Sequence, residues 1–328
     1  MDEIWYGRSA LAAALAPLAW LYGAAVYLRR HAYASGLAAM VEIPVPVVVV
    51  GNITAGGTGK TPLVVWIAHC LARHGYRPGV VCGGYRGQAR AWPQQVRADS
   101  DPVMVGEEAV LLARHCAAPV AAARNRIDAA LALLEHHGCD VLVCDDGLQH
   151  YRLSRDVEIA VVDGVRRFGN GRLLPAGPLR EPPSRLRSVD MIVTNGIAGR
   201  GEFPMRYVPG GARSMFDPAR EVALESFAPR EVHAVAGIGH PERFFSMLRA
   251  AGLRVHKHPF ADHHRFTAAQ ISFGDGLPVL MTEKDAIKCQ RFADREHWYV
   301  PIAAMLPEVF EHRLLALLRG KDDGQEPA

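Results

Sequence analysis

The chain has 328 residues, of which 49% are hydrophobic and 22% are charged. This composition is typical of a folded globular protein and excludes a disordered one, and the length fits one large domain or two ordinary domains. The net charge of +3 is too small to indicate nucleic-acid binding, so no nucleic-acid partner is expected.

The six cysteines show no pattern that predicts a metal site or a disulfide framework. They contain no CxxC pair and no matched spacing, and they lie at positions 70, 82, 116, 139, 144 and 289. Several lie inside apolar runs, which is where small buried residues are expected. The pattern therefore predicts reduced, buried cysteines in the cytosol.

The first expected element is a helix over residues 10–28, a stretch of 19 residues without a charge. Such a helix would be about 28 Å long, close to the thickness of a bilayer core. Pro17 lies in its middle, and Trp20, Tyr22 and Tyr27 suit a membrane interface better than its centre. Three interpretations remain: an interfacial helix, a buried helix of the globular domain, and a true span. Contact with a membrane surface is the favoured expectation.

The chain then alternates between short apolar runs and helical patterns. The expected strands are 45–50, 79–82, 118–121, 140–144, 157–162 and 189–193, and the expected helices are about 60–74, 106–116 and 124–137. This alternation predicts βαβ units and a three-layer α/β domain. Residues 204–216 are rich in glycine and proline and are expected to be a linker. A second, smaller βα series follows and ends in a helix near 307–319.

The clearest motif follows the first of these strands. Its residues are Thr54, Ala55, Gly56, Gly57, Thr58, Gly59, Lys60 and Thr61. A glycine-rich turn between a strand and a helix presents backbone N–H groups to a phosphate. Lys60 is expected to reach the β- and γ-phosphates, and Thr61 to hold Mg²⁺. The usual first glycine is Thr54 here, so an incidental glycine turn is the alternative.

A second motif, DVLVCDDGLQHYRL, spans residues 140–153. Its strand ends in Asp145-Asp146, where a Walker-B carboxylate meets the metal of a P-loop enzyme. We expect one carboxylate to bind Mg²⁺ and the other to position a nucleophile or the water on the metal. A plain strand cap is the alternative.

Three further stretches carry candidate chemistry. Glu107-Glu108 open a helix, and Asp262-His263-His264 lie in the second domain, where a histidine–carboxylate pair could activate a hydroxyl. The loop at 166–187 is rich in glycine, proline and arginine, which indicates an anionic ligand.

Five stretches together resemble the tetraacyldisaccharide 4′-kinases of lipid A biosynthesis. They are GNITAGGTGKTPLV, VCDDGLQHYRL, FGNGRLLPAGPLREP, FADHHRF and MTEKDAIKC. The resemblance runs in order along the chain, from about residue 8 to about residue 300. The resemblance implies transfer of the γ-phosphoryl group of ATP to the 4′-hydroxyl of a tetraacyldisaccharide 1-phosphate, which gives the bis-phosphorylated precursor lipid IVA. ATP and Mg²⁺ would be the cofactors. The protein would be peripheral or monotopic at the cytoplasmic face of a Gram-negative inner membrane.

The same resemblance implies the fold and its division. The fold would be α/β: a P-loop NTPase-like three-layer α/β/α sandwich with a second, smaller α/β domain. The P-loop kinase domain would span 31–203, with a membrane-surface helix at 1–30 as part of it. The linker would be 204–216, and the smaller domain 217–328. The resemblance leaves the protein partners unknown.

The resemblance also assigns roles to single residues. Asp145 would join Thr61 as a metal ligand, and Asp146 would act in the catalytic pocket. The family's Asp–His base would be Glu107 with His263, or with His264 as the alternative. This chain departs from the family at Glu107, which is one methylene longer than the expected aspartate. The residues expected to meet the lipid substrate are Gln149, Arg172 and Arg180.

Two rival functions remain at this stage. One is a P-loop kinase for a soluble small molecule, in which the N-terminal helix is only buried. The other is a membrane-associated nucleotide switch. Switches of that class carry an extra lysine where this chain has Ala55, which argues against the second rival.

Overall fold

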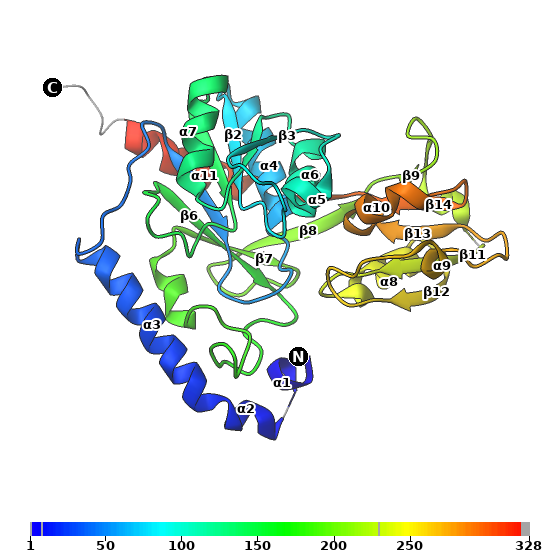
Figure 1. Ribbon diagram of the computed structural model, residues 1–328, viewed down its shortest axis with the longest axis horizontal. Helices are drawn as coiled ribbons and strands as arrows, with labels where there is room; N and C mark the ends of the chain where they lie inside the picture. Colours follow the sequence, from blue (N-terminus) through cyan, green and yellow to red (C-terminus); the bar gives the residue numbers. More distant parts are fainter. Residues whose placement is uncertain (1, 8, 229, 323–328) are drawn as a thin grey trace.

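The computed structural model describes residues 2–7, 9–228 and 230–322, and it has two lobes (Figure 1). The large lobe is built on a nine-stranded sheet and the small lobe on a six-stranded sheet. The strands of the large sheet are β1 (Val47–Gly51), β2 (Pro78–Cys82), β3 (Gln94–Val96), β4 (Val120–Ala122), β5 (Val141–Asp145), β6 (Val157–Asp163), β7 (Met191–Asn195), β8 (Phe203–Pro209) and β15 (Ile302–Met305). The helical segments of this lobe are α1 (Asp2–Tyr6), α2 (Ala10–Ala14), α3 (Ala16–Ala34), α4 (Lys60–Arg73), α5 (Pro102–Val105), α6 (Glu107–His115), α7 (Arg126–His137), η1 (Pro183–Ser188) and α11 (Glu308–Asp322).

The large sheet has the order β15-β8-β7-β6-β1-β5-β2-β4-β3, with antiparallel pairs only at its two edges among the described strands. Side chains of a strand alternate between its faces. Val48 and Val50 of β1 therefore join the core under α4, α6 and α11, whereas Val47 and Val49 join the core under α7. This arrangement is a three-layer α/β/α sandwich, which confirms the predicted fold class. The predicted strands between 45 and 193 and the predicted helices between 60 and 137 agree with the observed ones to within about two residues, whereas the predicted helix at 10–28 is two helices, of which the second runs to Ala34.

The small lobe lies beside the carboxyl ends of the large sheet's strands (Figure 1). Its sheet has the order β10-β9-β14-β13-β11-β12. The elements are β9 (Ala212–Ser214), β10 (Glu221–Val222), η2 (Leu224–Phe227), β11 (Glu231–Ala236), α8 (Pro241–Ala250), β12 (Arg254–Pro259), α9 (Ala268–Ile271), β13 (Val279–Thr282), α10 (Glu283–Cys289), η3 (Gln290–Phe292) and β14 (His297–Val300). Phe245 of α8 is fully buried against one face of this sheet, and Cys289 of α10 against the other.

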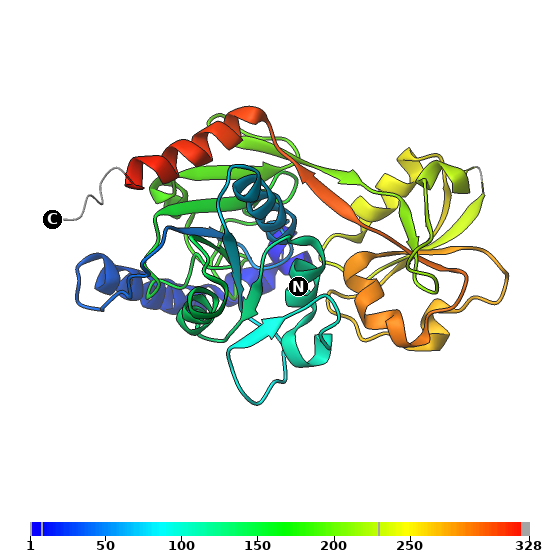
Figure 2. The same ribbon diagram turned by 90° about the horizontal axis from the view of Figure 1, so that it is seen from above.

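Residues 204–216 are not a simple linker, and the last helix does not belong to the small lobe. β8 pairs with β7 in the large sheet, and β15 pairs antiparallel with β8. Figure 2 shows this two-stranded ribbon crossing between the lobes, with α11 lying along the large lobe. Phe310, Leu314 and Leu318 of α11 are fully buried in the large lobe's core, and their burial explains why the chain returns there. The small lobe is thus an insertion between β8 and β15.

The N-terminal helices α2 and α3 run along the outside of the large lobe rather than inside it (Figure 1). Ala12 and Ala19 are their buried residues, whereas Trp20 is 75% exposed and Leu21 is 68% exposed. The interpretation as a buried helix is therefore wrong. Among the described residues, none of the helices combines the length and the apolarity that crossing a bilayer requires.

Candidate active site

The phosphate loop lies between β1 and α4, at the carboxyl edge of the large sheet. Gly56 and Gly59 have φ values of 103° and 101°, which favour glycine because a side chain is strained there. Asn52 Nδ2 donates to Thr58 Oγ1 at 3.1 Å, and Asn195 Nδ2 donates to Thr58 O at 3.2 Å. The loop is thus held from two sides, and its amides meet the N-terminus of α4 as an anion site requires.

Thr54, in place of the usual first glycine, has a structural explanation. It is buried and forms an isolated bridge with Leu179, and Ala55 N donates to Pro178 O at 2.7 Å. Thr54 is not among the described non-glycine residues with positive φ. This position therefore needs no glycine, because the neighbouring segment 178–179 sets the path of the chain.

Asp145 and Asp146 are neighbours at the end of β5 with opposite environments. Asp145 is only 4% exposed, Thr61 Oγ1 donates to its Oδ2 at 3.3 Å, and its Oδ1 has no hydrogen-bond partner among the described residues. Burial, together with the charge of Glu108, raises the pKa of Asp145 to about 7. A buried carboxylate oxygen without a partner fits a cation, so Thr61 and Asp145 are suited to hold Mg²⁺.

Asp146 has a backbone φ of 52° and lies between two cations. Lys60 Nζ is 3.5 Å from its Oδ1, and Arg180 Nη1 is 3.0 Å from the same oxygen. Burial opposes ionisation of Asp146, but Lys60 and Arg180 outweigh it and hold the pKa at about 2. Asp146 is therefore a fixed negative charge that orients Lys60 at the phosphate loop.

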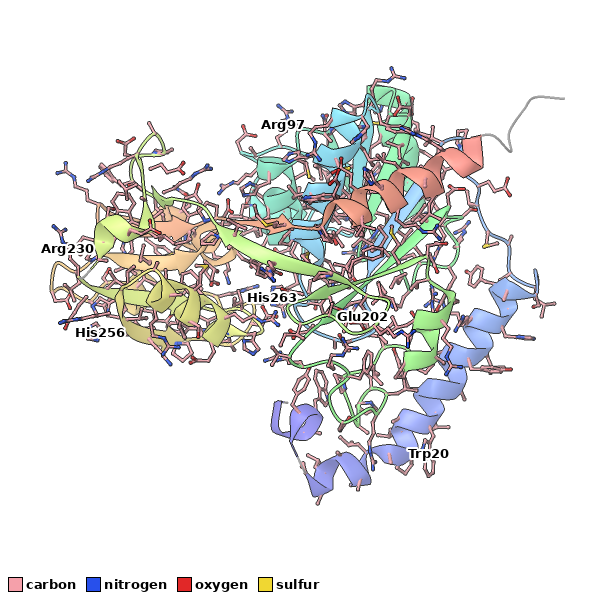
Figure 3. All side chains as sticks on the ribbon, turned by 180° about the vertical axis from the view of Figure 1, so that it is seen from behind. Trp20, Arg97, Glu202, Arg230, His256 and His263 are labelled. Atoms are coloured by element: carbon pink, nitrogen blue, oxygen red, sulfur yellow. The ribbon has the colours of Figure 1, made fainter. Side chains whose placement is uncertain are left out.

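Glu107 and His263, which the resemblance pairs, lie close together across the two lobes. His263 Nδ1 is 3.5 Å from Glu107 Oε2, and the ring of Tyr85 lies beside the imidazole. Burial raises the pKa of Glu107, but the contact with His263 and the charges of Lys288 and Lys284 outweigh it, so the net pKa is lowered. Figure 3 places His263 at the edge of the small lobe that faces the large lobe.

His264, the alternative to His263, faces its own lobe. Its Nε2 lies 3.0 Å from Gln270 Oε1, and its ring packs against Phe260 and Phe266. Of the two neighbouring histidines, the structure therefore brings His263 to Glu107 and uses His264 inside the small lobe.

The two lobes enclose a cavity of about 830 Å³ that contains the phosphate loop. Its lining includes Lys60, Thr61, Glu108, Asp262 and Lys284. Lys284 Nζ is 3.1 Å from Glu108 Oε1 and 3.7 Å from Asp262 Oδ1. The lysine thus links carboxylates of both lobes at the cavity wall.

A smaller pocket, of about 190 Å³, lies between α3 and the loop after β5; we call it the headgroup pocket. Its lining residues are Tyr22, Ala25, Val26, Arg29, Gln149, Tyr151, Arg180 and Glu181. Gln149 Nε2 donates to Glu181 Oε1 at 2.6 Å, and Arg180 Nη1 donates to Gln149 Oε1 at 3.4 Å. Two of the three predicted substrate residues, Gln149 and Arg180, thus lie together.

Arg172, the third predicted substrate residue, does not lie in the headgroup pocket. Its Nη1 donates to Ala12 O at 3.2 Å, and this bond ties the arginine-rich loop to α2. The structure gives Arg172 a contact that attaches the N-terminal helices to the large lobe.

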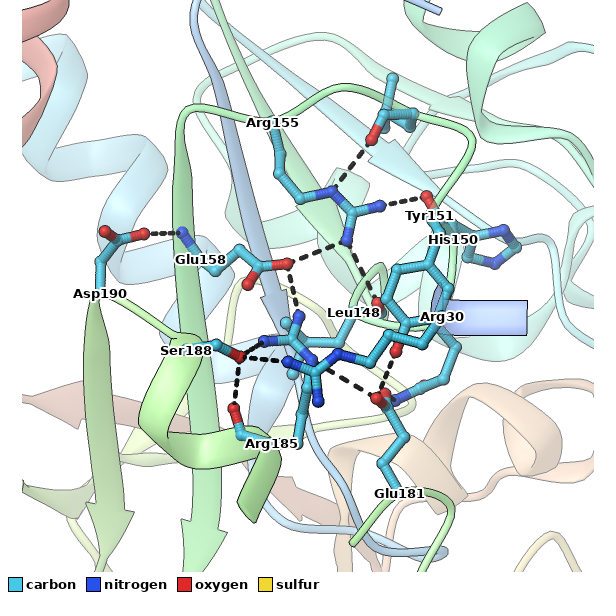
Figure 4. Close-up of polar contacts among 12 residues, drawn as sticks. Arg30, Leu148, His150, Tyr151, Arg155, Glu158, Glu181, Arg185, Ser188 and Asp190 are labelled. Atoms are coloured by element: carbon cyan, nitrogen blue, oxygen red, sulfur yellow. Dashed lines mark hydrogen bonds and ion pairs between the residues drawn. The ribbon is translucent and has the colours of Figure 1, made fainter. Parts of the chain in front are cut away.

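A buried ion network includes Tyr151 and Glu181 of the headgroup pocket (Figure 4). Arg185 lies 2.6 Å from Glu158 and 3.4 Å from Glu181, and Arg155 lies 3.0 Å from Glu158. Tyr151 Oη donates to Glu181 Oε2, the same oxygen that Arg185 contacts. These contacts fix Glu181, and through it Gln149, so the pocket is preorganised.

Several residues of the site were missed at the level of sequence. Asn195 ends β7, and the rule that ligands bind at the carboxyl ends of parallel strands could have found it. Tyr207 lines the cavity, and its hydroxyl blocks any side chain at Gly59, but it lay in the expected linker. Lys284 belongs to the quoted stretch MTEKDAIKC, to which no role had been assigned.

The opposite pKa shifts of the paired aspartates predict opposite effects on stability in a metal-free buffer. Folding raises the pKa of Asp145 from 3.8 to about 7, so the protonated carboxyl favours the folded protein. This contribution to the free energy of unfolding is lost as the pH rises through that range, because the buried group must then ionise. We expect Asp145→Asn to unfold at a higher temperature than the parent at about pH 8, with a smaller difference at about pH 6.

Asp146→Asn is the matched control. Its folded pKa is lowered to about 2, so its stabilising contribution is complete at both pH values and the variant should unfold at a lower temperature at each. Thermal unfolding with a chelator present measures both. A lower unfolding temperature for Asp145→Asn at the higher pH would contradict the assignment.

Comparison with known proteins identifies the family. The family model described as Tetraacyldisaccharide-1-P 4′-kinase matches residues 11–319. The tetraacyldisaccharide 4′-kinase of Nitrosococcus oceani is 53% identical over 315 residues, which cover 96% of this chain and 93% of that protein. The same kinase of an Azoarcus species is 47% identical over 332 residues, which cover 99% of this chain and 96% of that protein.

A solved structure agrees with these sequence matches. The crystal structure of LpxK from Aquifex aeolicus in complex with ATP superposes with a TM-score of 0.78 at 26% identity, covering 94% of this chain and 99% of that one. The chain therefore belongs to the tetraacyldisaccharide-1-phosphate 4′-kinase family and is an ATP-dependent kinase of lipid A biosynthesis.

Proposed function

We propose that the protein transfers the γ-phosphoryl group of ATP to the 4′-hydroxyl of a tetraacyldisaccharide 1-phosphate and so produces lipid IVA. The observation that carries this proposal is the position of the headgroup pocket. Arg180 lines that pocket and also contacts Asp146, which pairs with Lys60 of the phosphate loop. A polar headgroup bound beneath α3 would therefore lie beside the nucleotide site.

We assign nucleotide binding to residues 54–61. The loop amides and the N-terminus of α4 would hold the phosphates, and Lys60 would neutralise charge on the β- and γ-phosphates. Thr61 and Asp145 would hold Mg²⁺, which would supply positive charge to offset the negative charge that develops during transfer. Asp146 would keep Lys60 directed at the phosphates through its ion pair.

We assign proton removal to His263 and Glu107. Glu107 is closer to Nδ1, at 3.5 Å, than Asp262 is to Nε2, at 3.9 Å, so the tautomer that carries its proton on Nδ1 is favoured and the lone pair of Nε2 can accept a proton. In this arrangement His263 Nε2 would take the proton of the 4′-hydroxyl as its oxygen attacks the γ-phosphorus and the bond to ADP breaks. The ionised Glu107 would stabilise the imidazolium that forms.

The N-terminal helices would bring this site to the membrane. We define the apolar N-terminal face as Leu11, Leu18, Trp20, Leu21, Tyr27 and Leu28, all of them large and exposed. Such a face inserts at the boundary between headgroups and acyl chains, where the acyl chains of the substrate also lie. Arg29 lines the headgroup pocket at the end of this face and suits an anionic headgroup. The proposed location is the cytoplasmic face of a Gram-negative inner membrane, as a peripheral or monotopic protein.

The direct test is transfer of labelled γ-phosphate from ATP to a tetraacyldisaccharide 1-phosphate in mixed micelles. Lys60→Ala should lower kcat about 100-fold or more, because charge stabilisation at the transferred group is lost. Lys257→Ala is the matched control and should keep full activity, since Lys257 lies on the small lobe and pairs with the exposed Glu242. Failure of the parent chain to form labelled lipid, with ATP still bound, would refute the proposed function.

The base assignment predicts non-additive losses. Glu107→Gln and His263→Gln should each lower kcat about 100-fold or more, with little change in the KM for ATP. The double variant should be no slower than the worse single variant, because the two residues act as one unit. His264→Gln, which keeps a polar group beside Gln270, should retain activity. Losses that multiply in the double variant, or an equal loss in His264→Gln, would contradict the assignment.

The membrane assignment predicts a defect that is specific for lipid. Leu21→Glu should weaken binding to vesicles of phosphatidylethanolamine and phosphatidylglycerol about tenfold or more, because it loses buried apolar area and places a charge at the interface. Its apparent KM for micellar lipid should rise while ATP affinity stays unchanged. Leu131→Glu, at an exposed leucine of α7, is the control and should bind vesicles like the parent. Equal vesicle binding by Leu21→Glu would exclude this face as the anchor.

A further inference from the structure

Three potential metal ligands from two helices meet far from the active site. They are Cys70 of α4, His74 at the C-terminal cap of α4 and Glu311 of α11, and their ligand atoms all lie within 4.8 Å of one another. We propose that Cys70, His74 and Glu311 form a second metal site, for Zn²⁺ or a similar transition metal, that joins the end of α4 to α11.

The spacing of these atoms matches a tetrahedral site. Cys70 and His74 are four residues apart, so they lie on the same face of α4. His74 Nε2 is 3.5 Å from Glu311 Oε1. Zinc bonds of about 2.1 Å at tetrahedral angles place two ligand atoms about 3.4 Å apart, so this pair needs almost no movement.

The hydrogen bonds around the cluster orient its atoms as ligands. His74 Nδ1 is 2.9 Å from Cys70 O. Because a carbonyl oxygen can only accept a hydrogen bond, the ring proton lies on Nδ1. The lone pair of Nε2 then points toward Glu311. Metal-bound histidines characteristically donate their other N–H to a carbonyl or carboxylate in this way. Arg73 Nη2 holds Glu311 Oε2 at 3.0 Å and leaves Oε1 facing His74.

The donor types select the metal. A thiol and an imidazole favour Zn²⁺ over Mg²⁺, which prefers oxygen. Burial, with the charge of Glu311, raises the pKa of the Cys70 thiol to about 11, so metal binding would release its proton to solvent. His74 and Glu311 are partly exposed, which gives the ion a path of entry and leaves room for water as a fourth ligand.

The position separates this site from the proposed Mg²⁺ site. Cys70 and His74 lie 10 and 14 residues beyond Lys60, which at about 1.5 Å per residue is about 15–20 Å along α4. A metal here would fasten the returning C-terminal helix to the helix that begins at the phosphate loop. Its role would be structural, and it would not contact the nucleotide.

The test uses full-length protein stripped with a chelator and then dialysed against Zn²⁺ or Co²⁺. We expect one equivalent bound per chain in the absence of nucleotide, and a thiolate-to-cobalt charge-transfer band with Co²⁺. Cys70→Ser should abolish that band, and His74→Gln and Glu311→Gln should lower the affinity at least tenfold. Zn²⁺ should raise the unfolding temperature of the parent but not that of His74→Gln.

Two matched controls keep the test specific. His312→Gln changes an exposed histidine next to Glu311, and Cys139→Ser changes a buried cysteine elsewhere; both should bind metal like the parent. Equal binding by His74→Gln, or a cobalt spectrum without a thiolate band, would overturn the proposal and leave the cluster as an ordinary ion pair between two helices. His74 lies at the surface, so its variant should fold even where a substitution of Cys70 does not.

Discussion

The site depends on a single constraint: two neighbouring carboxylates at the end of β5 are held in different electrostatic states. Side chains alternate between the two faces of a strand, and Asp146 also has a positive φ, so the two carboxylates point in different directions. Asp145 accepts a hydrogen bond from Thr61, whereas Asp146 contacts Lys60 and Arg180. Among the described residues, Asp145 has no ion pair and Asp146 has two. The phosphate loop, the proposed metal site and the headgroup pocket are all connected through this pair.

The sequence predicted well the features that depend on local patterns. Buried parallel strands appear as apolar runs, and the glycine loop and Asp145-Asp146 follow such runs directly. Contacts between segments that are distant in the chain were harder to predict from the sequence. β8 is a mostly exposed strand bounded by proline, so it resembled a linker, and the burial of Phe310 depends on a sheet that the C-terminal sequence alone does not reveal. The sequence does not reveal that Cys70 and His74 approach Glu311 for the same reason, since His74 and Glu311 are 237 positions apart.

The unusual glutamate at position 107 is accommodated by its surroundings. Gly106 has a φ of 97°, and a side chain there would collide with Tyr85 O, so the start of α6 is fixed closely against the segment that carries Tyr85. Glu107 reaches His263 from this fixed position at 3.5 Å, the outer range of an ion pair. The additional methylene is therefore compatible with contact between the two groups, and the lysines nearby keep the carboxylate ionised.

The order of the strands has a consequence for synthesis of the protein. The small lobe is continuous in sequence, so it can complete its own sheet while the ribosome is still at work. The large lobe cannot: β15 and α11 come from the last part of the described chain, and they supply an edge strand and one wall of its core. Until they emerge, the apolar side of α4 behind the phosphate loop stays uncovered. Of the large lobe's core, the nascent chain therefore exposes that surface of α4 longest.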